Sequence, residues 1–235
     1  MKEKSIVISA ALIAVAVVLL GLSLKAAINH FADRDRVVTV RGLCEKEVAA
    51  NKVTWPIVTK EAGNDLIAIY SKVKSTNETI VDFLKANGID DSEIMIGAPQ
   101  VYDQATERYG SNDYKYRYSV TNVVVVTSQK VQLVQELINK QSDLMRQGLA
   151  IIAGTYEYNT SYEYTDLNTI KPEMIAEATA NAREAADRFA ADSHSKLGKI
   201  QSATQGQFSI TDRDQYTPSI KTVRVVTYIT YYLQD

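Results

Sequence analysis

The side chains best suited to chemistry in this sequence are few and lie far apart. The chain has a single cysteine, Cys44, and two histidines, His30 and His194. A thiol or hydroxyl nucleophile needs a base within hydrogen-bonding reach. Ser193 and Ser195 flank His194, but neighbouring residues at the end of a helix point in different directions, so they form no dyad by themselves. We therefore predict that the protein is not an enzyme.

The sequence also lacks the ligand sets of common metal and nucleotide sites. One cysteine and two histidines are too few for the usual zinc or iron–sulfur centres. The acidic runs Asp90–Glu93 and Asp212–Asp214 do not have the ligand spacing of an EF-hand loop and are typical of solvated turns. No glycine-rich phosphate-binding motif is present. We expect neither a metal nor a cofactor.

Tyrosine is the residue type that points to a binding surface. The chain has 14 tyrosines, against 4 phenylalanines and 1 tryptophan. Several recur at every second position and would share one face of a strand. These candidates for an interface are Tyr114, Tyr116, Tyr118, Tyr156, Tyr158, Tyr162 and Tyr164. Such bands pair across strands, line interfaces between subunits or stack on glycan rings, and the sequence leaves these three roles open.

Composition and charge place the chain among ordinary globular proteins. It has 235 residues, of which 46% are hydrophobic and 23% charged. The formal net charge of −2 gives no basic surplus of the kind that nucleic-acid binders usually show. A single cysteine excludes a disulfide within the chain. We expect no nucleic-acid partner.

An uncharged apolar run, Ser5–Leu24, lies near the N-terminus. A helix of this length rises about 30 Å, enough to cross a membrane. The run is longer than the core of a cleaved signal peptide, and Leu24-Lys25-Ala26 is a poor cleavage site. We predict a signal-anchor over residues 1–25, with a cleaved signal peptide as the alternative. The short N-terminal tail favours export of the C-terminal part.

Beyond a linker over residues 26–35, the hydrophobic pattern predicts one domain with two similar halves, about 36–128 and 149–235. Each half contains a helix followed by two strands. The expected helices lie at 65–87, 130–146 and 172–194, and the expected strands at 38–48, from 53, 94–106, 114–127, 149–164, 200–210 and 222–233. We therefore predict an α+β fold of duplicated strand–helix–strand–strand units. Its sheet is mainly antiparallel, with long hairpins packed by helices, and one transmembrane helix precedes it.

Two stretches of the sequence carry a family resemblance. Residues 176–200 read AEATANAREAADRFAADSHSKLGKI, an alanine-rich helix with Ala182-Arg183 that leads into Leu197-Gly198. The strand over residues 38–42 reads VTVRG, a V-x-V-x-G pattern. In order and separation these motifs resemble the SIMPL (DUF541) family of exported bacterial proteins, from about residue 36 to the C-terminus. Asn51-Lys52 departs from the Pro-Asp of many members, and Ser5–Leu24 departs from their removable signal.

The resemblance implies a periplasmic protein of the bacterial cell envelope. It also implies a link to envelope and oxidative-stress tolerance, and some members form large ring-like oligomers. We therefore expect a non-enzymatic envelope protein that acts by homo-oligomeric assembly or by protein interaction. The alternative is a ligand-binding module for cell-wall glycan that uses the tyrosine-rich strand faces.

The strand pattern also predicts the environment of Cys44. Val38, Val40, Gly42 and Cys44 share one face of the first strand. The cysteine lies too far beyond Leu24 to be a lipid-modified anchor residue. We predict that the thiol packs as a small apolar group rather than acting in redox chemistry.

Overall fold

The computed structural model describes residues 13–25, 36–106, 115–152 and 157–234. The chain divides into two compact units. Unit 1 comprises Met1–Lys46, Asn168–Ser209 and Val223–Asp235, and unit 2 comprises Glu47–Leu167 and Ile210–Thr222. The division falls within the first and the last strand, β1 (Val37–Ala49) and β10 (Ile220–Gln234). The fold is α+β with mostly antiparallel sheets, as predicted.

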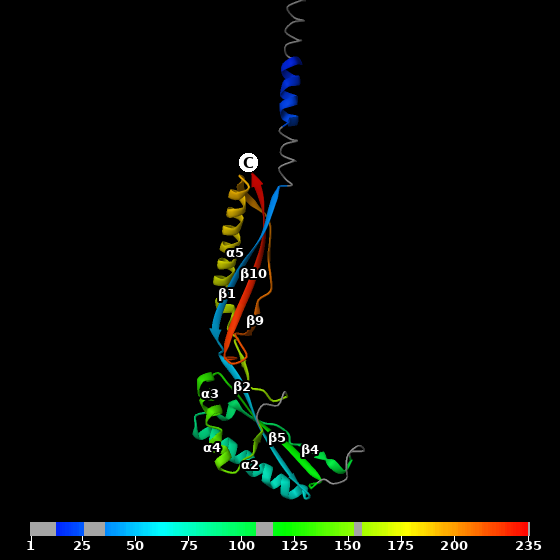
Figure 1. Ribbon diagram of the computed structural model, residues 1–235, viewed down its shortest axis with the longest axis vertical. Helices are drawn as coiled ribbons and strands as arrows, with labels where there is room; N and C mark the ends of the chain where they lie inside the picture. The colour runs from blue at the N-terminus through cyan, green and yellow to red at the C-terminus, as the bar shows by residue number, and fades with distance from the viewer. Residues whose placement is uncertain (1–12, 26–35, 107–114, 153–156, 235) are drawn as a thin grey trace, which may run out of the picture. The chain divides into compact units, whose positions relative to one another are not determined.

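Unit 1 is a sheet covered on one face by a long helix. Its strands lie in the order β1, β10, β8 (Lys196–Gln205). A short strand, β9 (Ser209–Asp212), which belongs mostly to unit 2, also pairs with β10. The helix α5 (Leu167–Asp192) runs beside these strands in Figure 1. Its buried residues recur every fourth position: Met174, Ala178, Ala182, Ala186 and Ala190. Such small side chains let a helix lie close on a sheet, and two of them pack with Val40, Ile229 and Tyr231.

Unit 2 is built around the pairing of β2 (Lys52–Gly63) with β5 (Tyr118–Ser128). The register runs from Val53 opposite Ser128 to Gly63 opposite Tyr118. The strands β3 (Ile94–Ile96) and β4 (Gln100–Asp103) pair with the other edge of β5, and β6 (Ile151–Ile152) and β7 (Ser161–Glu163) pair with β2. All these pairs are antiparallel.

Helices cover one face of the unit 2 sheet. Figure 1 shows α2 (Leu66–Ala86), α3 (Val131–Asn139) and α4 (Ser142–Arg146) on the same side of β2 and β5. Alternate residues of the two strands face them, because strand side chains point to opposite faces in turn. The resulting core consists mainly of Val53, Trp55, Ile57, Ile80, Leu84, Val124, Val126, Val134 and Leu137.

The helix α2 is capped at both ends by local residues. The side chain of Asp65 accepts hydrogen bonds from the backbone N–H groups of Ile67 and Ala68, as an N-cap does. At the other end, Gly88 has a positive φ of 92°, a conformation that glycine adopts without steric cost. The local sequence therefore decides where this helix begins and ends.

Several expected elements differ in the structure. The strand expected over 94–106 is interrupted at Pro99, which cannot donate to a strand ladder, and gives β3, β4 and a 3-10 turn, η2 (Gln104–Thr106). The strand expected over 149–164 is replaced by β6 and β7, and residues 153–156 lie outside the described residues. The helix expected over 130–146 is divided into α3 and α4, and α5 begins before Pro172, which lies inside it.

The N-terminal prediction falls partly outside the described residues. Residues 13–25 are helical, whereas residues 1–12 and the linker 26–35 are not described. Among the described residues, none of the helices has both the length and the apolar character needed to cross a membrane. The anchor over Ser5–Leu24 therefore stays a prediction. The division of the folded part into two similar halves also stays a prediction.

Candidate interaction surfaces

The first group of predicted tyrosines, Tyr114, Tyr116 and Tyr118, lies near the start of β5 in the sequence. Tyr114 is outside the described residues, and Tyr116 precedes β5, with 40% of its surface exposed. The Nζ atom of Lys115 lies 5.3 Å from the centre of the Tyr116 ring. Tyr118 begins the strand and packs against a small apolar cluster that includes Ile69. Of this group, Tyr118 is thus engaged inside unit 2.

The second group of tyrosines lies around β7. Tyr156 is outside the described residues, and Tyr158 and Tyr164 are half-buried on either side of the strand. Tyr162 lies opposite Val53 and packs against the unit 2 core. Burial raises the pKa of its phenol above the usual value, against the opposite effect of its hydrogen bond with Gln135. An interface or a glycan site formed by these tyrosines stays a prediction.

The unit 1 sheet has a face that α5 does not cover. Figure 1 shows β1 and β10 running in opposite directions, and the N–H of Leu233 donates to the carbonyl of Arg36 at 2.8 Å. With this register, residues of the two strands form direct cross-strand pairs. In three of these pairs the side chains contact each other. The hydroxyl oxygens of Thr39 and Thr230 are 3.1 Å apart, the guanidinium of Arg41 lies 5.1 Å from the ring centre of Tyr228, and the carboxylate of Glu45 lies 3.2 Å from Nε of Arg224.

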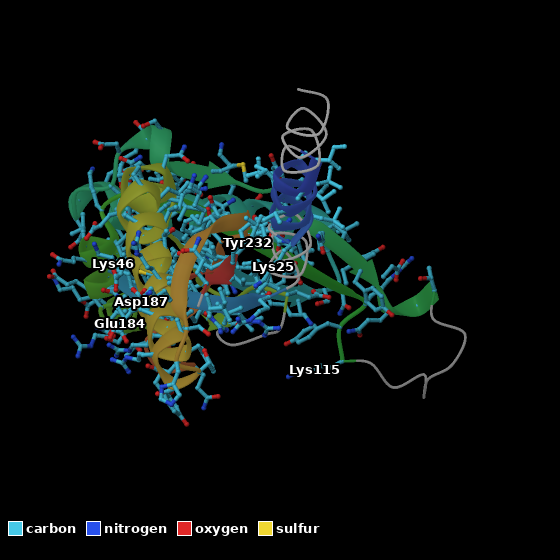
Figure 2. The ribbon with its side chains drawn as sticks, turned by 90° about the horizontal axis from the view of Figure 1, so that it is seen from above. Lys25, Lys46, Lys115, Glu184, Asp187 and Tyr232 are labelled. Atoms are coloured by element: carbon cyan, nitrogen blue, oxygen red, sulfur yellow. The ribbon has the colours of Figure 1, made fainter. Side chains whose placement is uncertain are left out.

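The same face also carries partly exposed apolar and aromatic side chains. Val37 is 38% exposed, Leu43 is 40% exposed and Tyr228 is 39% exposed. Figure 2 shows Tyr232 on this side of unit 1, whereas Glu184 and Asp187 lie along α5. A mixture of tyrosine, arginine and half-exposed apolar groups is typical of protein interfaces. Sequence reasoning missed this surface, because the outer face of β1 is defined only once α5 covers the inner one.

The two outer strands of the unit 1 sheet differ in how much other groups cover their unpaired edges. β1 and β8 each pair with β10 on one side, and in the described residues no strand pairs with their other side. On β1, the side-chain amide of Asn181 donates to the carbonyl of Leu43 at 2.8 Å. β8 is exposed at every position except Leu197 and Gly198, which are half-buried. A long outer strand of this kind is a template for pairing with another chain.

Cys44 is a packed thiol on the inner face of β1, as predicted. It is 2% exposed, and its Sγ donates a hydrogen bond to Oε2 of Glu177 at 3.2 Å. Burial, together with this carboxylate, raises the pKa of the thiol to about 11. The thiol is therefore protonated at neutral pH, and the protonated form is a poor nucleophile. The sequence pattern predicted the burial but not the hydrogen bond.

The two acidic runs are turns stabilised by their own contacts. The N–H of Asp90 donates to Glu93, and the ammonium group of Lys130 lies 2.6 Å from Asp90 and 3.1 Å from Glu93. Asp214 accepts hydrogen bonds from Thr217 and Arg213, which lower the pKa of its carboxyl to about 2. Across the described ranges, no three His, Cys, Asp or Glu side chains are grouped so that they could hold a metal ion.

His194 is exposed and ends α5 rather than meeting a nucleophile. Its φ of 54° is in the left-handed region. Its N–H donates to Ala191 at 3.0 Å, and the N–H of Ser195 donates to Ala190 at 2.8 Å. These two bonds form a Schellman motif, a common end of a helix. The predicted helix-end role of His194 is confirmed.

Comparison with known proteins identifies the family of the chain. No curated protein matches the sequence. A protein-family description, "SIMPL: Protein of unknown function (DUF541)", matches residues 38–227. The match extends from β1 into β10 and includes most of both units. The chain belongs to the SIMPL (DUF541) family.

Proposed function

We propose that this protein is a non-enzymatic protein of the cell envelope that acts by assembly with further copies of itself. The observation that carries this proposal is the exposed outer strand β8 in unit 1. Its C-terminal part, Ile200–Gln205, has no charged residue. Proteins usually protect outer strands with charges, prolines or covering segments, and this part of β8 has neither charge nor proline. We infer that a strand of a second copy pairs with it.

The uncovered sheet face on β1 and β10 supports the same proposal. The Arg41–Tyr228 contact and the half-exposed Leu43 lie on the uncovered face of the unit 1 sheet. We infer that this face gives a second copy a further surface to contact, in addition to the β8 edge. Strand pairing supplies main-chain hydrogen bonds, and side chains on the face supply specificity. Assembly therefore has both a backbone and a side-chain basis in unit 1.

Light scattering on the full chain tests the assembly. We expect a mass that is a multiple of the 26.1 kDa chain. Ala203→Lys puts a charge in the uncharged part of β8, at an exposed position, and should shift the mass toward that of the monomer. Ala180→Lys places the same charge on an exposed position of α5 and should leave the mass unchanged. A monodisperse wild-type monomer at about 50 μM would contradict the proposal, since specific interfaces commonly form well below that concentration.

We also propose that Ser5–Leu24 anchors the chain in the membrane, with the folded part exported. The proposal rests on the uncharged apolar sequence and its length, and a role in envelope or oxidative-stress tolerance follows from the family resemblance. The intact mass of the chain recovered from membranes separates an anchor from a cleaved signal. A mass lacking the N-terminal segment would replace the anchor by the signal peptide.

A further inference from the structure

A polar hollow lies on the uncovered face of the unit 2 sheet. Neighbouring strands place two rows of side chains on this face, because residues paired across strands share a side. Lys60 lies opposite Thr121, which lies opposite Gln100; in the next row, Ala62 lies opposite Ser119, which lies opposite Tyr102. The register of β2, β5 and β4 therefore builds the hollow.

The hollow has a volume of about 450 Å³, a size at which pockets hold small organic ligands. Its lining is mainly polar and consists of Lys60, Gln100, Val101, Tyr102, Gln104, Ser119 and Thr121. These side chains provide one cation, two amides, two aliphatic hydroxyls and one aromatic ring with a phenol. Such groups can donate and accept hydrogen bonds around a single small molecule.

Ser119 is the member of this lining that points most directly to a ligand. The residue is 5% exposed, and its Oγ has no hydrogen-bond partner. A buried hydroxyl without a partner is costly, and native proteins rarely leave one unpaired. Since Ser119 borders the hollow, a ligand oxygen there could accept or donate the missing hydrogen bond.

The charge in the hollow comes from Lys60. The neighbouring carboxylates are paired with other cations: Glu61 lies 2.6 Å from Lys72, and Asp103 lies 2.9 Å from Arg117. Among the described residues, no carboxylate is within ion-pair distance of Lys60, which is exposed. The hollow thus presents a positive charge that favours an anionic ligand.

We propose that this hollow binds a sugar acid, meaning a hydroxyl-rich ring that carries a carboxylate. The carboxylate would lie on the ammonium group of Lys60, and ring hydroxyls would bond Ser119, Gln100 and Gln104. One face of the ring would contact Tyr102, which is 46% exposed, since an aromatic side chain offers an apolar body beside its polar tip. This site is separate from the assembly surface and does not depend on it.

Calorimetric titration of the full chain with sodium glucuronate tests the site. The protein is kept in a detergent without a sugar headgroup, so that the detergent cannot occupy the hollow. We expect saturable binding with a Kd of about 1 mM. Glucose, which lacks the carboxylate, and acetate, which lacks the ring, should each bind at least about tenfold more weakly. A glucuronate disaccharide distinguishes the two possible ligands, a free sugar acid and the end of an acidic glycan. If the site binds the end of a glycan, the disaccharide should bind more tightly than glucuronate; if it binds a free sugar acid, it should not.

Single substitutions locate the binding. Lys60→Gln should weaken glucuronate binding about tenfold, and Ser119→Ala about fivefold. Lys74→Gln is the matched control, since Lys74 is an exposed lysine on α2, and it should leave the affinity unchanged. Thermal unfolding of each variant verifies that it is folded. No saturable binding, or binding that Lys60→Gln and Ser119→Ala leave unchanged, or an equal loss in Lys74→Gln, would overturn the proposal.

Discussion

Gly42 lies in backbone contact with Ala178. A Cβ atom added to Gly42 would stand 1.8 Å from the carbonyl oxygen of Ala178 and 2.6 Å from the backbone nitrogen of Ala182. No side chain fits at such distances, so any other residue at position 42 would push α5 away from β1. The V-x-V-x-G strand and the alanine-rich helix, the two motifs of the family resemblance, are therefore the two sides of one contact.

Substitution of Gly42 tests this contact. Gly42→Ala should lower the free energy of unfolding by about 3 kcal/mol, because overpacking against a backbone cannot be relieved by rotating a side chain. Urea unfolding followed by circular dichroism measures the change. Gly63→Ala is the matched control in another strand: its nearest new contact would be the side chain of Ile69 at 3.2 Å, and we expect a loss below about 1 kcal/mol. Equal losses in the two variants would argue against the contact.

The thiol of Cys44 should be unreactive in the folded protein. At pH 8 a disulfide reagent should label it much more slowly than in urea, because the pKa of about 11 leaves little thiolate. Glu177→Gln removes the carboxylate that accepts its hydrogen bond and should increase the labelling rate. Fast labelling of the folded wild-type chain would contradict the buried position.

The same thiol makes stability depend on pH. Folding raises its pKa from 9.0 to about 11, so the folded state holds the proton more tightly than the unfolded state. The resulting contribution to stability is complete below pH 9 and is lost as the pH rises toward 11. Unfolding of wild type and Cys44→Ala across this range measures the difference. Parallel curves for the two proteins would show that the thiol has no such effect.

Thr59 carries a buried hydroxyl that has no hydrogen-bond partner. It is 2% exposed and lies opposite Asn122, on the helix face of β2. Thr59→Val keeps the shape and removes the polar atom, and should raise the free energy of unfolding by about 1 kcal/mol. Thr54→Val, at a half-buried position on the other face of β2, should change it by less than about 0.5 kcal/mol. A destabilised Thr59→Val would mean that the hydroxyl is bonded.

A glycine at position 194 should stabilise the C-terminal end of α5. His194 has a φ of 54°, which costs energy for a residue with a Cβ atom. His194→Gly should raise the thermal midpoint, with a gain of about 1 kcal/mol in the free energy of unfolding. His194→Ala keeps the Cβ atom and should show no such gain. An equal gain for alanine would assign the effect to the imidazole instead of the backbone.

The sequence predicts where helices and strands lie better than it predicts which strands pair with each other. β1, β2, α2 and β10 follow from alternation, helical periodicity and caps, because these signals are local. Yet β1 and β2, which are adjacent in sequence, lie in different sheets. Pairing depends on which helix covers which face, and no local pattern records that. For the same reason Lys60, Ser119 and Gln100 could not be brought together in advance, since only the register of β2, β5 and β4 makes them neighbours.

The pairing of β1 with β10 has a consequence for how the chain is made. Thr39 and Thr230 face each other although they are 191 residues apart in sequence. On the ribosome, β1 has no partner strand until β10 has been synthesised. The β2–β5 pair needs only the residues up to Ser128, so it can form long before β10 has been synthesised. Contacts of such wide separation form slowly, so β1 is the segment that a nascent chain must keep from aggregating for longest.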